Sequence, residues 1–280
     1  MDTATDIRAV RSALIPVRRA GRRIALVPTM GNLHAGHLAL VARAREVADC
    51  TVVSIFVNPF QFGEGEDWAA YPRTFEQDKA KLEAAGADLL FAPVARDIYP
   101  DGPARITRIE VPQLGNVLCG AFRPTFFRGV ATVVGILFNV VAPDRALFGE
   151  KDYQQLVLIR RMVRDLKMPI DIVSVPTVRE ADGLAMSSRN GYLNKQERRI
   201  APGLYQTLCE IRQAISDGEQ DFPALEARGM GMLRERGFGP DYLAVRRADD
   251  LAVAKAGDRR LRVLAAAWLG RARLIDNIPW

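Results

Sequence analysis

Histidine and cysteine are scarce in this chain, which has 2 histidines and 3 cysteines among its 280 residues. The cysteines, Cys50, Cys119 and Cys209, are odd in number and far apart, which favours neither a disulfide framework nor a zinc site. We therefore expect a reducing compartment, the cytoplasm. The N-terminus has acids where a signal peptide needs positive charge, and no apolar run reaches membrane-spanning length. We expect neither export nor a membrane partner.

Neither sign of charge dominates the sequence. It has 39 lysines and arginines and 33 aspartates and glutamates, which give a formal net charge of +6. That balance favours anionic partners without choosing among nucleotide, nucleic acid and solvated surface. Arginine pairs such as Arg18-Arg19 and Arg198-Arg199 lack an aromatic-rich RNA motif or basic helix beside them. We expect these pairs to be solvated and expect no nucleic-acid partner. Hydrophobic residues at 49% and charged residues at 26% are typical of a globular protein.

Both histidines lie in one stretch, Val27-Pro28-Thr29-Met30-Gly31-Asn32-Leu33-His34-Ala35-Gly36-His37-Leu38. An apolar run over 24–27 predicts a buried strand that breaks at Pro28 and Gly31, and a helical pattern opens at about His37. Glycines let a ligand approach the backbone, and a helix N-terminus directs N–H groups at a bound anion. His34 and His37 can both donate to a phosphate. A glycine turn with a histidine helix cap would explain the same residues.

Strands and helices alternate along the first part of the chain. We expect strands over 24–27, 51–57, 87–92, 145–148 and 170–175, and helices over 6–14, 38–48, 74–85, 130–141 and 153–166. Alternation of this kind predicts right-handed crossovers and an α/β fold, a Rossmann-like doubly wound parallel sheet. The pattern changes beyond Gly191, where helices over 196–215 and 224–236 and strands near 242–246 and 261–268 indicate a smaller α+β domain. We expect two domains, residues 1–180 and 181–280.

Two polar segments follow predicted strands, and each has two interpretations. Asn58 and Gln61 offer amide donors and acceptors suited to a substrate with hydroxyl and carboxylate groups, since ligands bind at the carboxyl ends of parallel strands. An Asn-Pro turn explains the same letters. In the glycine turn after 145–148, Lys151 is a compact charge suited to a phosphoryl group. Asp152 and Gln155 in the same turn also fit a capping-box variant.

A third polar segment, 185–190, contains Ser187, Ser188 and Arg189. Two hydroxyls and a guanidinium could wrap a polyphosphate, because a guanidinium donates to phosphate in a bidentate manner. A plain serine-rich turn is the alternative. This loop places the last of the candidate phosphate-binding groups in the second predicted domain.

Together these segments resemble the HIGH and KMSKS signatures of the nucleotidylyltransferase superfamily, and more closely the pantoate–β-alanine ligase family. The motifs that carry the resemblance are PTMGNLHAGH at 28–37, FVNPFQF at 56–62, YPRT at 71–74, FGEKDYQQL at 148–156, READGLAMSSRN at 179–190, and AAA at 265–267 with RLIDN at 273–277. The resemblance spans nearly the whole chain. It implies that ATP and pantoate give pantoyl adenylate and pyrophosphate, after which β-alanine attacks the acyl carbon to give pantothenate and AMP.

The resemblance also implies roles for individual residues. It assigns the ATP site to Met30, Gly31, Asn32, Leu33, His34, Ala35, Gly36, His37, Gly149, Glu150, Lys151, Asp152, Val178, Met186, Ser187, Ser188 and Arg189. The catalytic residues among these are His34, His37, Lys151, Ser188 and Arg189. Pantoate would be bound by Asn58, Gln61 and Gln155, with Gln61 also facing β-alanine. Met186 to Arg189 would close over the phosphates. Mg²⁺ would bridge the phosphates through protein ligands that the sequence does not identify, with Asp78 as a candidate outer carboxylate. The family precedent implies a homodimer.

Two positions depart from the family pattern. Phe126 stands where the family usually has a histidine, and Ile136 where it usually has a lysine. The resemblance places both near the crevice, so they put catalytic efficiency in question more than fold. Two other functions remain open on the residues alone. One is adenylate or cytidylate transfer to a different small acceptor, which would not require the 58–61 segment. The other is a nucleic-acid-binding, synthetase-like protein that uses the basic C-terminal third.

Overall fold

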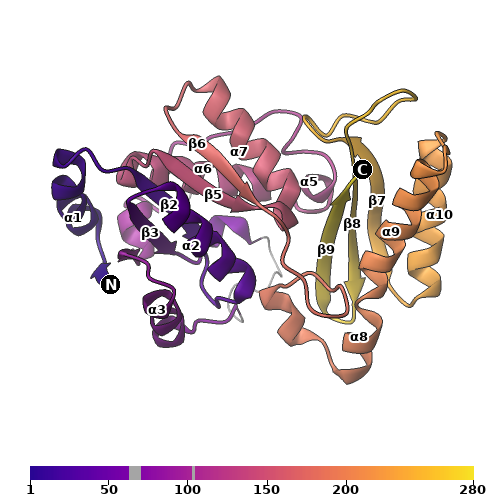
Figure 1. Ribbon diagram of the computed structural model, residues 1–280, viewed down its shortest axis with the longest axis horizontal. Helices are drawn as coiled ribbons and strands as arrows, with labels where there is room; N and C mark the ends of the chain where they lie inside the picture. Colours follow the sequence, from indigo (N-terminus) through magenta and orange to yellow (C-terminus); the bar gives the residue numbers. More distant parts are fainter. Residues whose placement is uncertain (63–70, 103–104) are drawn as a thin grey trace. The chain divides into compact units, whose positions relative to one another are not determined.

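The computed structural model describes residues 1–62, 71–102 and 105–280, which group into two compact units. The first unit comprises Met1–Glu150 and Leu158–Pro176, and the second comprises Lys151–Val157 and Thr177–Trp280. The short segment Lys151–Val157 therefore groups with the C-terminal residues, although it follows a strand of the first unit. Each unit has its own sheet and is described by itself (Figure 1).

The first unit is built on a six-stranded sheet of order β1-β4-β3-β2-β5-β6. Its strands are β1 (Asp2–Ala4), β2 (Ile24–Thr29), β3 (Cys50–Ile55), β4 (Leu89–Phe91), β5 (Arg145–Gly149) and β6 (Asp171–Val175). Every pairing in this sheet is parallel, and β2 pairs with β3 in register from Ile24↔Cys50 to Thr29↔Ile55. Consecutive residues of β2 are buried, as expected for a parallel strand covered on both faces.

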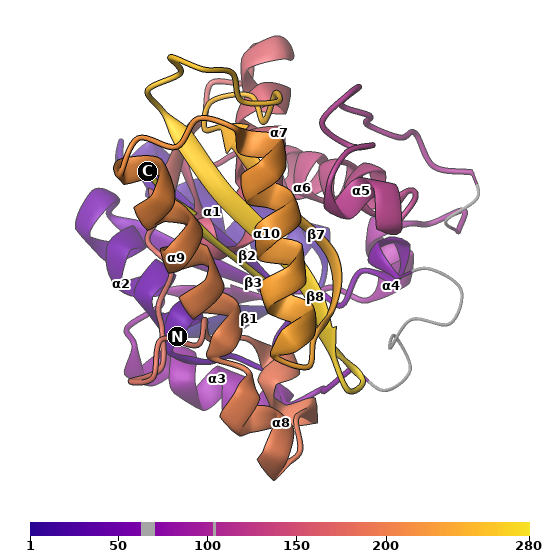
Figure 2. The same ribbon diagram turned by 90° about the vertical axis from the view of Figure 1, so that its right-hand side faces the viewer.

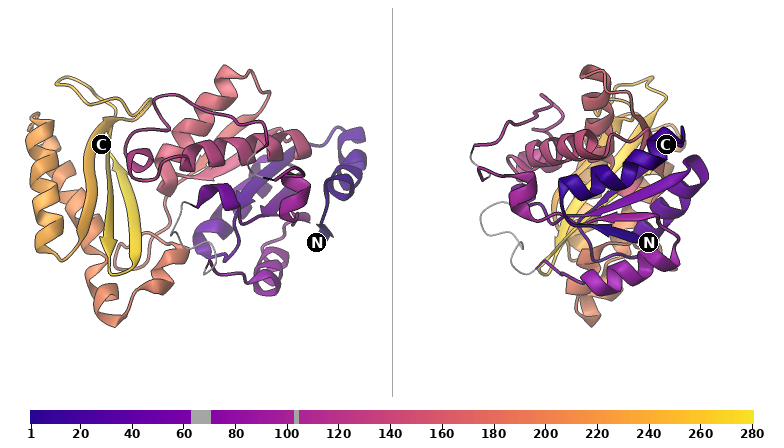
Figure 3. Two further views of the ribbon diagram at one scale, coloured as in Figure 1. Left: turned by 180° about the vertical axis from the view of Figure 1, so that it is seen from behind. Right: turned by 90° about the vertical axis from the view of Figure 1, so that its left-hand side faces the viewer.

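Helices cover both faces of this sheet. The helices of the first unit are α1 (Ile7–Arg19), α2 (Ala35–Val47), α3 (Phe75–Ala84), α4 (Ala95–Ile98), α5 (Cys119–Phe122) and α6 (Phe126–Val141), and α7 (Tyr153–Asp165) divides between the units. Helices α2 and α3 pack together on one face, and α1 and α6 pack together on the other (Figure 3). The strand order therefore turns back between β2 and β5, which is the topological switch point of a doubly wound sheet.

The second unit is an antiparallel sheet under two helices. Its strands β7 (Gly239–Arg247), β8 (Leu261–Leu269) and β9 (Ala272–Pro279) follow one another in space as in sequence. Helices α9 (Gly203–Ser216) and α10 (Phe222–Glu235) lie side by side over one face of this sheet (Figure 2), and α8 (Lys195–Ile200) precedes them. Leu208, Ile211 and Val263 are fully buried in the core between the sheet and its helices.

The α/β fold class predicted from the sequence is confirmed, whereas individual elements differ from expectation. The single helix expected over 196–215 is two helices, because Pro202 removes a backbone N–H at the break between α8 and α9. The short strand β1 and the last strand β9 were not predicted as strands. Helix α6 begins at Phe126, four residues before the start of its predicted range. Among the described residues, no helix combines the length and apolar character needed to cross a membrane.

Candidate active site

The candidate segments of the first unit all begin where a parallel strand ends. Strand β2 ends at Thr29 and runs into the histidine turn, β3 ends at Ile55 before Asn58, and β5 ends at Gly149. Because β2 pairs in parallel with both β3 and β5, these three carboxyl ends meet at one edge of the sheet (Figure 1). That edge flanks the switch point, where doubly wound sheets bind their ligands.

A carboxylate from helix α3 shapes the turn that follows β2. Gly31 and Asn32 adopt positive φ angles of 81° and 50°, so their N–H groups cannot continue the strand ladder. The Asp78 carboxylate, only 1% exposed, accepts hydrogen bonds from the backbone N–H of Asn32 at 2.8 Å and of Leu33 at 2.7 Å, and from the Thr74 hydroxyl at 3.0 Å. These bonds assign Asp78 to holding the backbone of this turn.

Two further side chains, from β2 and α3, bind backbone groups of this turn. The Thr29 hydroxyl accepts from the Gly31 N–H at 3.2 Å and donates to the Ser54 carbonyl at 2.8 Å. The Lys81 ammonium donates to the Leu33 carbonyl at 2.7 Å. A β-carbon on Gly31 would lie 3.1 Å from an Asp78 carboxylate oxygen. Glycine therefore suits both the positive φ angle and the close approach of Asp78.

The two histidines cap helix α2. His34 Nδ1 accepts from the Gly36 N–H at 3.1 Å, and His37 Nδ1 accepts from the His34 N–H at 3.3 Å, which together form a capping box. Their ring centroids lie 4.1 Å apart. Because each Nδ1 accepts a hydrogen bond, the network assigns the proton of each neutral ring to Nε2. The cap interpretation is thus correct.

The remaining residues of this predicted ATP segment lie along the same turn. Met30, Gly31, Asn32 and Leu33 form the turn itself, and Ala35, Gly36 and His37 form the first turn of α2. The N-terminus of a helix directs free N–H groups and the positive end of the helix dipole outward. The structure therefore brings together the eight consecutive residues expected to bind ATP at the end of β2.

Asn58 is buried in a saturated hydrogen-bond cluster at the end of β3. Only 1% exposed, it caps the 3₁₀ helix η1 (Pro59–Gln61) by accepting from the Phe60 N–H at 3.2 Å. Its amide nitrogen donates to the Gly129 carbonyl at 3.2 Å and to Gln61 Oε1 at 3.0 Å, and its oxygen accepts from the Tyr99 hydroxyl at 2.7 Å. Both amide hydrogens and both lone pairs of Asn58 are in use, so it positions Gln61.

Gln61 is also held by its backbone. Its main-chain carbonyl accepts from Arg123 Nη2 at 3.0 Å, and the Arg123 guanidinium lies 3.8 Å from the centroid of the Phe126 ring. A guanidinium over an aromatic face is a favourable cation–π pair. Phe126, which stands at the position where the family usually has histidine, therefore packs against the arginine that holds Gln61. Ile136 is half-buried in α6.

The lysine turn continues from β5 into the second unit. Residues Glu150–Asp152 form the 3₁₀ helix η2, and Lys151 Nζ lies 3.8 Å from an Asp152 carboxylate oxygen. Within the second unit, Asn277 of β9 donates from its side-chain amide to the Lys151 carbonyl at 2.9 Å. Arg262 Nε in turn donates to Asn277 Oδ1 at 2.6 Å. The backbone of the lysine turn is thus held by the C-terminal strand.

The first turn of α7 carries Gln155. The capping-box interpretation of Asp152 and Gln155 stays a prediction. The first residue of the helix, Tyr153, lies under the Arg262 guanidinium at 3.8 Å and donates its hydroxyl to the Ala248 carbonyl at 3.0 Å. Gln155 is half-buried at the start of α7.

The serine–arginine loop follows a tight hairpin, and an ion pair connects this hairpin to β9, the strand that also carries Asn277. The Met186 N–H donates to the Val178 carbonyl at 3.0 Å, and Arg179 bridges to Ala185. Arg179 forms a bidentate ion pair with Asp276 at 2.6 and 2.9 Å. Burial raises the pKa of the Asp276 carboxyl, and the Arg179 guanidinium opposes that rise.

The loop itself is a capped 3₁₀ turn. Ser187 is the cap of η3 (Ser188–Tyr192), and its hydroxyl accepts from the Arg189 N–H at 3.2 Å. Asn190 donates to the Ala185 carbonyl at 3.1 Å. Both residues tie the loop to its own hairpin, so Ser188 and Arg189 extend from a defined backbone.

Sequence reasoning missed the supporting contacts of several residues, although it named Asp78 as a candidate outer carboxylate for Mg²⁺ and included 276 and 277 in a family motif. Asp78, Tyr99 and the Asp276–Asn277 pair hold the predicted segments, yet each lies far from its partner in sequence. One feature of the sequence could have indicated the role of Asp78, because this residue lies four positions after Thr74 on the buried side of a short helix. A carboxylate in that place needs partners.

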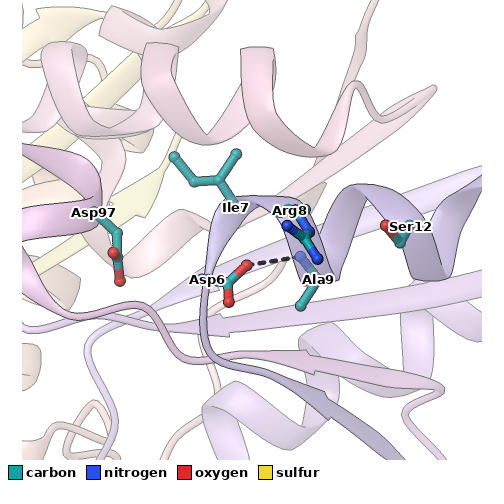
Figure 4. Close-up of a pocket in the computed structure, with 6 residues that line it drawn as sticks. All are labelled: Asp6, Ile7, Arg8, Ala9, Ser12 and Asp97. Carbon is teal, nitrogen blue, oxygen red and sulfur yellow. Dashed lines mark hydrogen bonds between the residues drawn. The ribbon is translucent and has the colours of Figure 1, made fainter.

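A surface hollow of about 820 Å³ lies beside the N-terminus of α1 and is lined by Asp6, Ile7, Arg8, Ala9, Ser12 and Asp97 (Figure 4). None of the candidate site residues lines it. Asp6 is engaged as the helix cap, since its carboxylate accepts from the Ala9 N–H at 2.7 Å. We assign it no ligand.

Comparison with known proteins gives a consistent result over the full chain. The family model described as pantoate-beta-alanine ligase matches residues 2–279. The pantothenate synthetase of Azotobacter vinelandii is 59% identical over 278 residues, covering 99% of this chain and 98% of that protein. The pantothenate synthetase of Thioalkalivibrio sulfidiphilus is 57% identical over 279 residues, with 100% and 98% covered.

Solved structures agree with the sequence comparisons. The crystal structure of pantothenate synthetase from Thermus thermophilus superposes with a TM-score of 0.93 at 47% identity, covering 99% of each chain. The pantoate-beta-alanine ligase of Francisella tularensis, complexed with beta-gamma ATP and β-alanine, superposes with a TM-score of 0.82 at 34% identity, covering 99% of this chain and 97% of that one.

Proposed function

This chain belongs to the pantoate–β-alanine ligase family, and we propose that it makes pantothenate by way of a pantoyl adenylate. In the first half-reaction, a pantoate carboxylate oxygen attacks the α-phosphorus of ATP and pyrophosphate leaves. In the second, the amine of β-alanine attacks the acyl carbon, and AMP leaves with the electron pair of the broken C–O bond. The observation that carries the proposal is the edge of the sheet where β2, β3 and β5 end. The segments that follow these strands carry side chains able to donate hydrogen bonds to phosphate and carboxylate oxygens.

The histidine turn is proposed to bind the ATP phosphates. His34 and His37 accept backbone N–H groups at Nδ1, which supports Nε2–H donation from each ring to a phosphate oxygen. The residues from Met30 to Gly36 are proposed to line the ATP site beside these rings, and hydrogen bonds within the turn hold most of their backbone N–H groups in place. Donors that are already held in place cost little reorganisation when charge develops on the phosphates.

Lys151 is proposed to stabilise the charge that builds on the α-phosphate. Adenylation needs little covalent help from protein, so alignment and charge neutralisation supply most of the rate. Asn277 fixes the Lys151 carbonyl, which supports a defined starting point for the side chain. Gly149, Glu150, Asp152 and Val178 complete the proposed nucleotide contacts.

Four further residues are proposed to act on the phosphates from the hairpin loop. Met186, Ser187, Ser188 and Arg189 follow a hairpin that the Arg179–Asp276 pair anchors. Hydroxyl and guanidinium donors suit the leaving pyrophosphate. Water excluded by such contacts could not hydrolyse the adenylate.

Pantoate is proposed to bind Gln61 and Gln155, with Asn58 holding Gln61 in place. Gln61 is 8% exposed, and Asn58 accepts and donates its full set of hydrogen bonds within the protein. Asn58 therefore supports the substrate through Gln61. The β-alanine carboxylate and amine are proposed to approach from the Gln61 side.

Mg²⁺ is proposed to accompany ATP. In the described part of the chain, no group of three or more His, Cys, Asp and Glu side chains could hold a metal ion by itself. Mg²⁺ commonly keeps several waters and binds through substrate phosphates. We therefore propose that the ion enters the site bound to the triphosphate of ATP. When bound it supplies charge neutralisation of the leaving pyrophosphate. A homodimer and a cytoplasmic location are proposed from family precedent.

The proposal is tested by exchange of labelled pyrophosphate into ATP. Purified protein is given ATP, Mg²⁺ and labelled pyrophosphate without β-alanine, in the presence and absence of pantoate. We expect exchange only when pantoate is present, because the first half-reaction is then reversible. Exchange without pantoate, or none with it, would overturn the assignment of pantoate as the acid that is adenylated. Other small hydroxy acids in the same assay would define the acceptor.

A further inference from the structure

Tyr99 is a buried phenol that lies behind the proposed pantoate-binding residues. It follows α4, is 3% exposed, and packs edge-on against Phe60 with ring centroids 4.8 Å apart. Its hydroxyl makes a 2.7 Å hydrogen bond with Asn58 Oδ1. Asn58 in turn contacts Gln61. Tyr99 therefore reaches the proposed substrate only through two side-chain amides.

The backbone decides the direction of every hydrogen bond in this chain of contacts. The Phe60 N–H can only donate and the Gly129 carbonyl can only accept, so their contacts fix which atom of Asn58 is oxygen and which is nitrogen. Asn58 Oδ1 then accepts from Tyr99, which makes the phenol the donor. Burial raises the pKa of the Tyr99 hydroxyl above its ordinary value, so the proton stays on the hydroxyl.

The same logic fixes the amide of Gln61. The second hydrogen on the Asn58 amide nitrogen points at Gln61 Oε1 at 3.0 Å. The Gln61 oxygen is therefore occupied by a protein donor, and in the described part of the chain no residue accepts a hydrogen bond from Gln61 Nε2. The amide nitrogen is left as the group that meets a ligand.

We propose that Tyr99 is a positioning residue that acts through Asn58 to present Gln61 to the substrate as a hydrogen-bond donor. This inference rests on the proposed placement of pantoate at Gln61. A donor at this point selects an acceptor, such as a carboxylate or hydroxyl oxygen of a hydroxy acid. Loss of the Tyr99 hydroxyl removes one of the two donors to Asn58 Oδ1, so Asn58 holds the Gln61 amide less firmly and the contact with this acceptor weakens.

The test combines Tyr99→Phe and Gln61→Ala in a double-mutant cycle, with pantoate-dependent pyrophosphate exchange as the readout. Tyr99→Phe keeps the ring and removes only the hydroxyl. We expect it to raise KM for pantoate about 5- to 10-fold, the size of one lost hydrogen bond, and to leave KM for ATP unchanged. In the Gln61→Ala background, the same change should add less than about twofold, because residues acting in one chain of contacts are not additive.

A matched control removes another buried hydroxyl hydrogen bond from the second unit. The Thr207 hydroxyl is fully buried, donates to the Gly203 carbonyl at 2.8 Å and accepts from Arg236. Thr207→Val should lower the denaturation midpoint and leave both KM values unchanged. Equal rises in both KM values, an unchanged KM for pantoate, or full additivity with Gln61→Ala would overturn the role of Tyr99. Absence of pantoate-dependent exchange in the wild-type protein would instead overturn the proposed function.

Discussion

At the residue scale, a hydrogen bond to the backbone of Lys151 helps to position its charged side chain. Lys151 has 19% of its side chain exposed, and its Nζ lies 3.8 Å from an Asp152 carboxylate oxygen. At this distance the ion pair with Asp152 is weak, so the ammonium can also interact with another anion. The Asn277 contact to its carbonyl fixes where the side chain starts. These features support the proposed role of Lys151 towards the α-phosphate.

Replacing Lys151 with alanine should lower the rate of adenylation by about a hundredfold or more, since removal of one preorganised group that stabilises transition-state charge has this effect. The fold should persist, because the ion pair lost with the side chain is weak. Stopped-flow or exchange kinetics measure the rate, and circular dichroism checks the fold. The control is Lys167→Ala, an exposed lysine that should leave the rate unchanged. Near-normal turnover of Lys151→Ala would remove this lysine from the mechanism.

The sequence identified the residue types of the site but not the partners that hold them. The histidines, Lys151 and Gln61 stand in short segments that local reasoning can find. Asp78 lies 46 residues from the Asn32 N–H that it accepts from, and Asn277 lies 126 residues from the Lys151 carbonyl. Such pairs depend on tertiary packing, which no local pattern encodes. The assignments of individual residues to substrates therefore stay predictions.

At the element scale, a glycine lets α6 approach the 3₁₀ helix that carries Gln61. A β-carbon on Gly129 would lie 2.4 Å from the Phe60 carbonyl oxygen, closer than atoms can pack. The Gly129 carbonyl also accepts from Asn58. The spacing between α6 and η1 and the orientation of Asn58 thus depend on the same residue.

Gly129→Ala should destabilise the protein by about 1–3 kcal/mol, because overpacking against backbone cannot be relieved by a side-chain rotation. It should also raise KM for pantoate more than KM for ATP, since η1 must shift. Chemical denaturation and exchange kinetics measure the two effects. Gly231→Ala is the matched control, because its β-carbon would meet nothing within 4 Å in helix α10. That variant should gain up to about 1 kcal/mol. A Gly129→Ala protein of wild-type stability would contradict the close approach.

Elements were predicted well where the apolar pattern was strong and poorly where the chain is short or interrupted. Strands β2 and β3 are continuous β-rich runs, and both were found. Strand β1 has three residues and gains its pairing only from β4. The break at Pro202 was missed because helical periodicity continues on both sides of it.

At the scale of the whole molecule, the C-terminal strand of the second unit supports two separate predicted site segments. Adjacent residues of β9 do this, because Asp276 pairs with Arg179 and Asn277 holds the Lys151 carbonyl. Asp276 and Asn277 are each 3% exposed. The final residues of the chain therefore order the lysine turn and the hairpin before the serine–arginine loop.

Asn277→Ala should lower the maximum rate of exchange by about tenfold while KM for pantoate stays within about twofold. The reason is that Lys151 keeps its charge but loses one hydrogen bond that fixes its backbone, and small misplacements of charge are costly in a transition state. The control is Asn194→Ala, which removes a cap from α8 and should lower stability by about 1 kcal/mol without changing the rate. An unchanged maximum rate in Asn277→Ala would contradict the support of the lysine turn by β9.

The most direct test of the account is the fate of oxygen-18 placed in the pantoate carboxylate. If a carboxylate oxygen attacks the α-phosphorus and β-alanine then attacks the acyl carbon, one labelled oxygen must leave with AMP. Mass spectrometry of the products of a complete reaction with ATP, Mg²⁺ and β-alanine would measure this transfer. We expect AMP with one labelled oxygen and unlabelled pyrophosphate. Label in inorganic phosphate with formation of ADP would show attack at the γ-phosphorus and contradict the adenylate route.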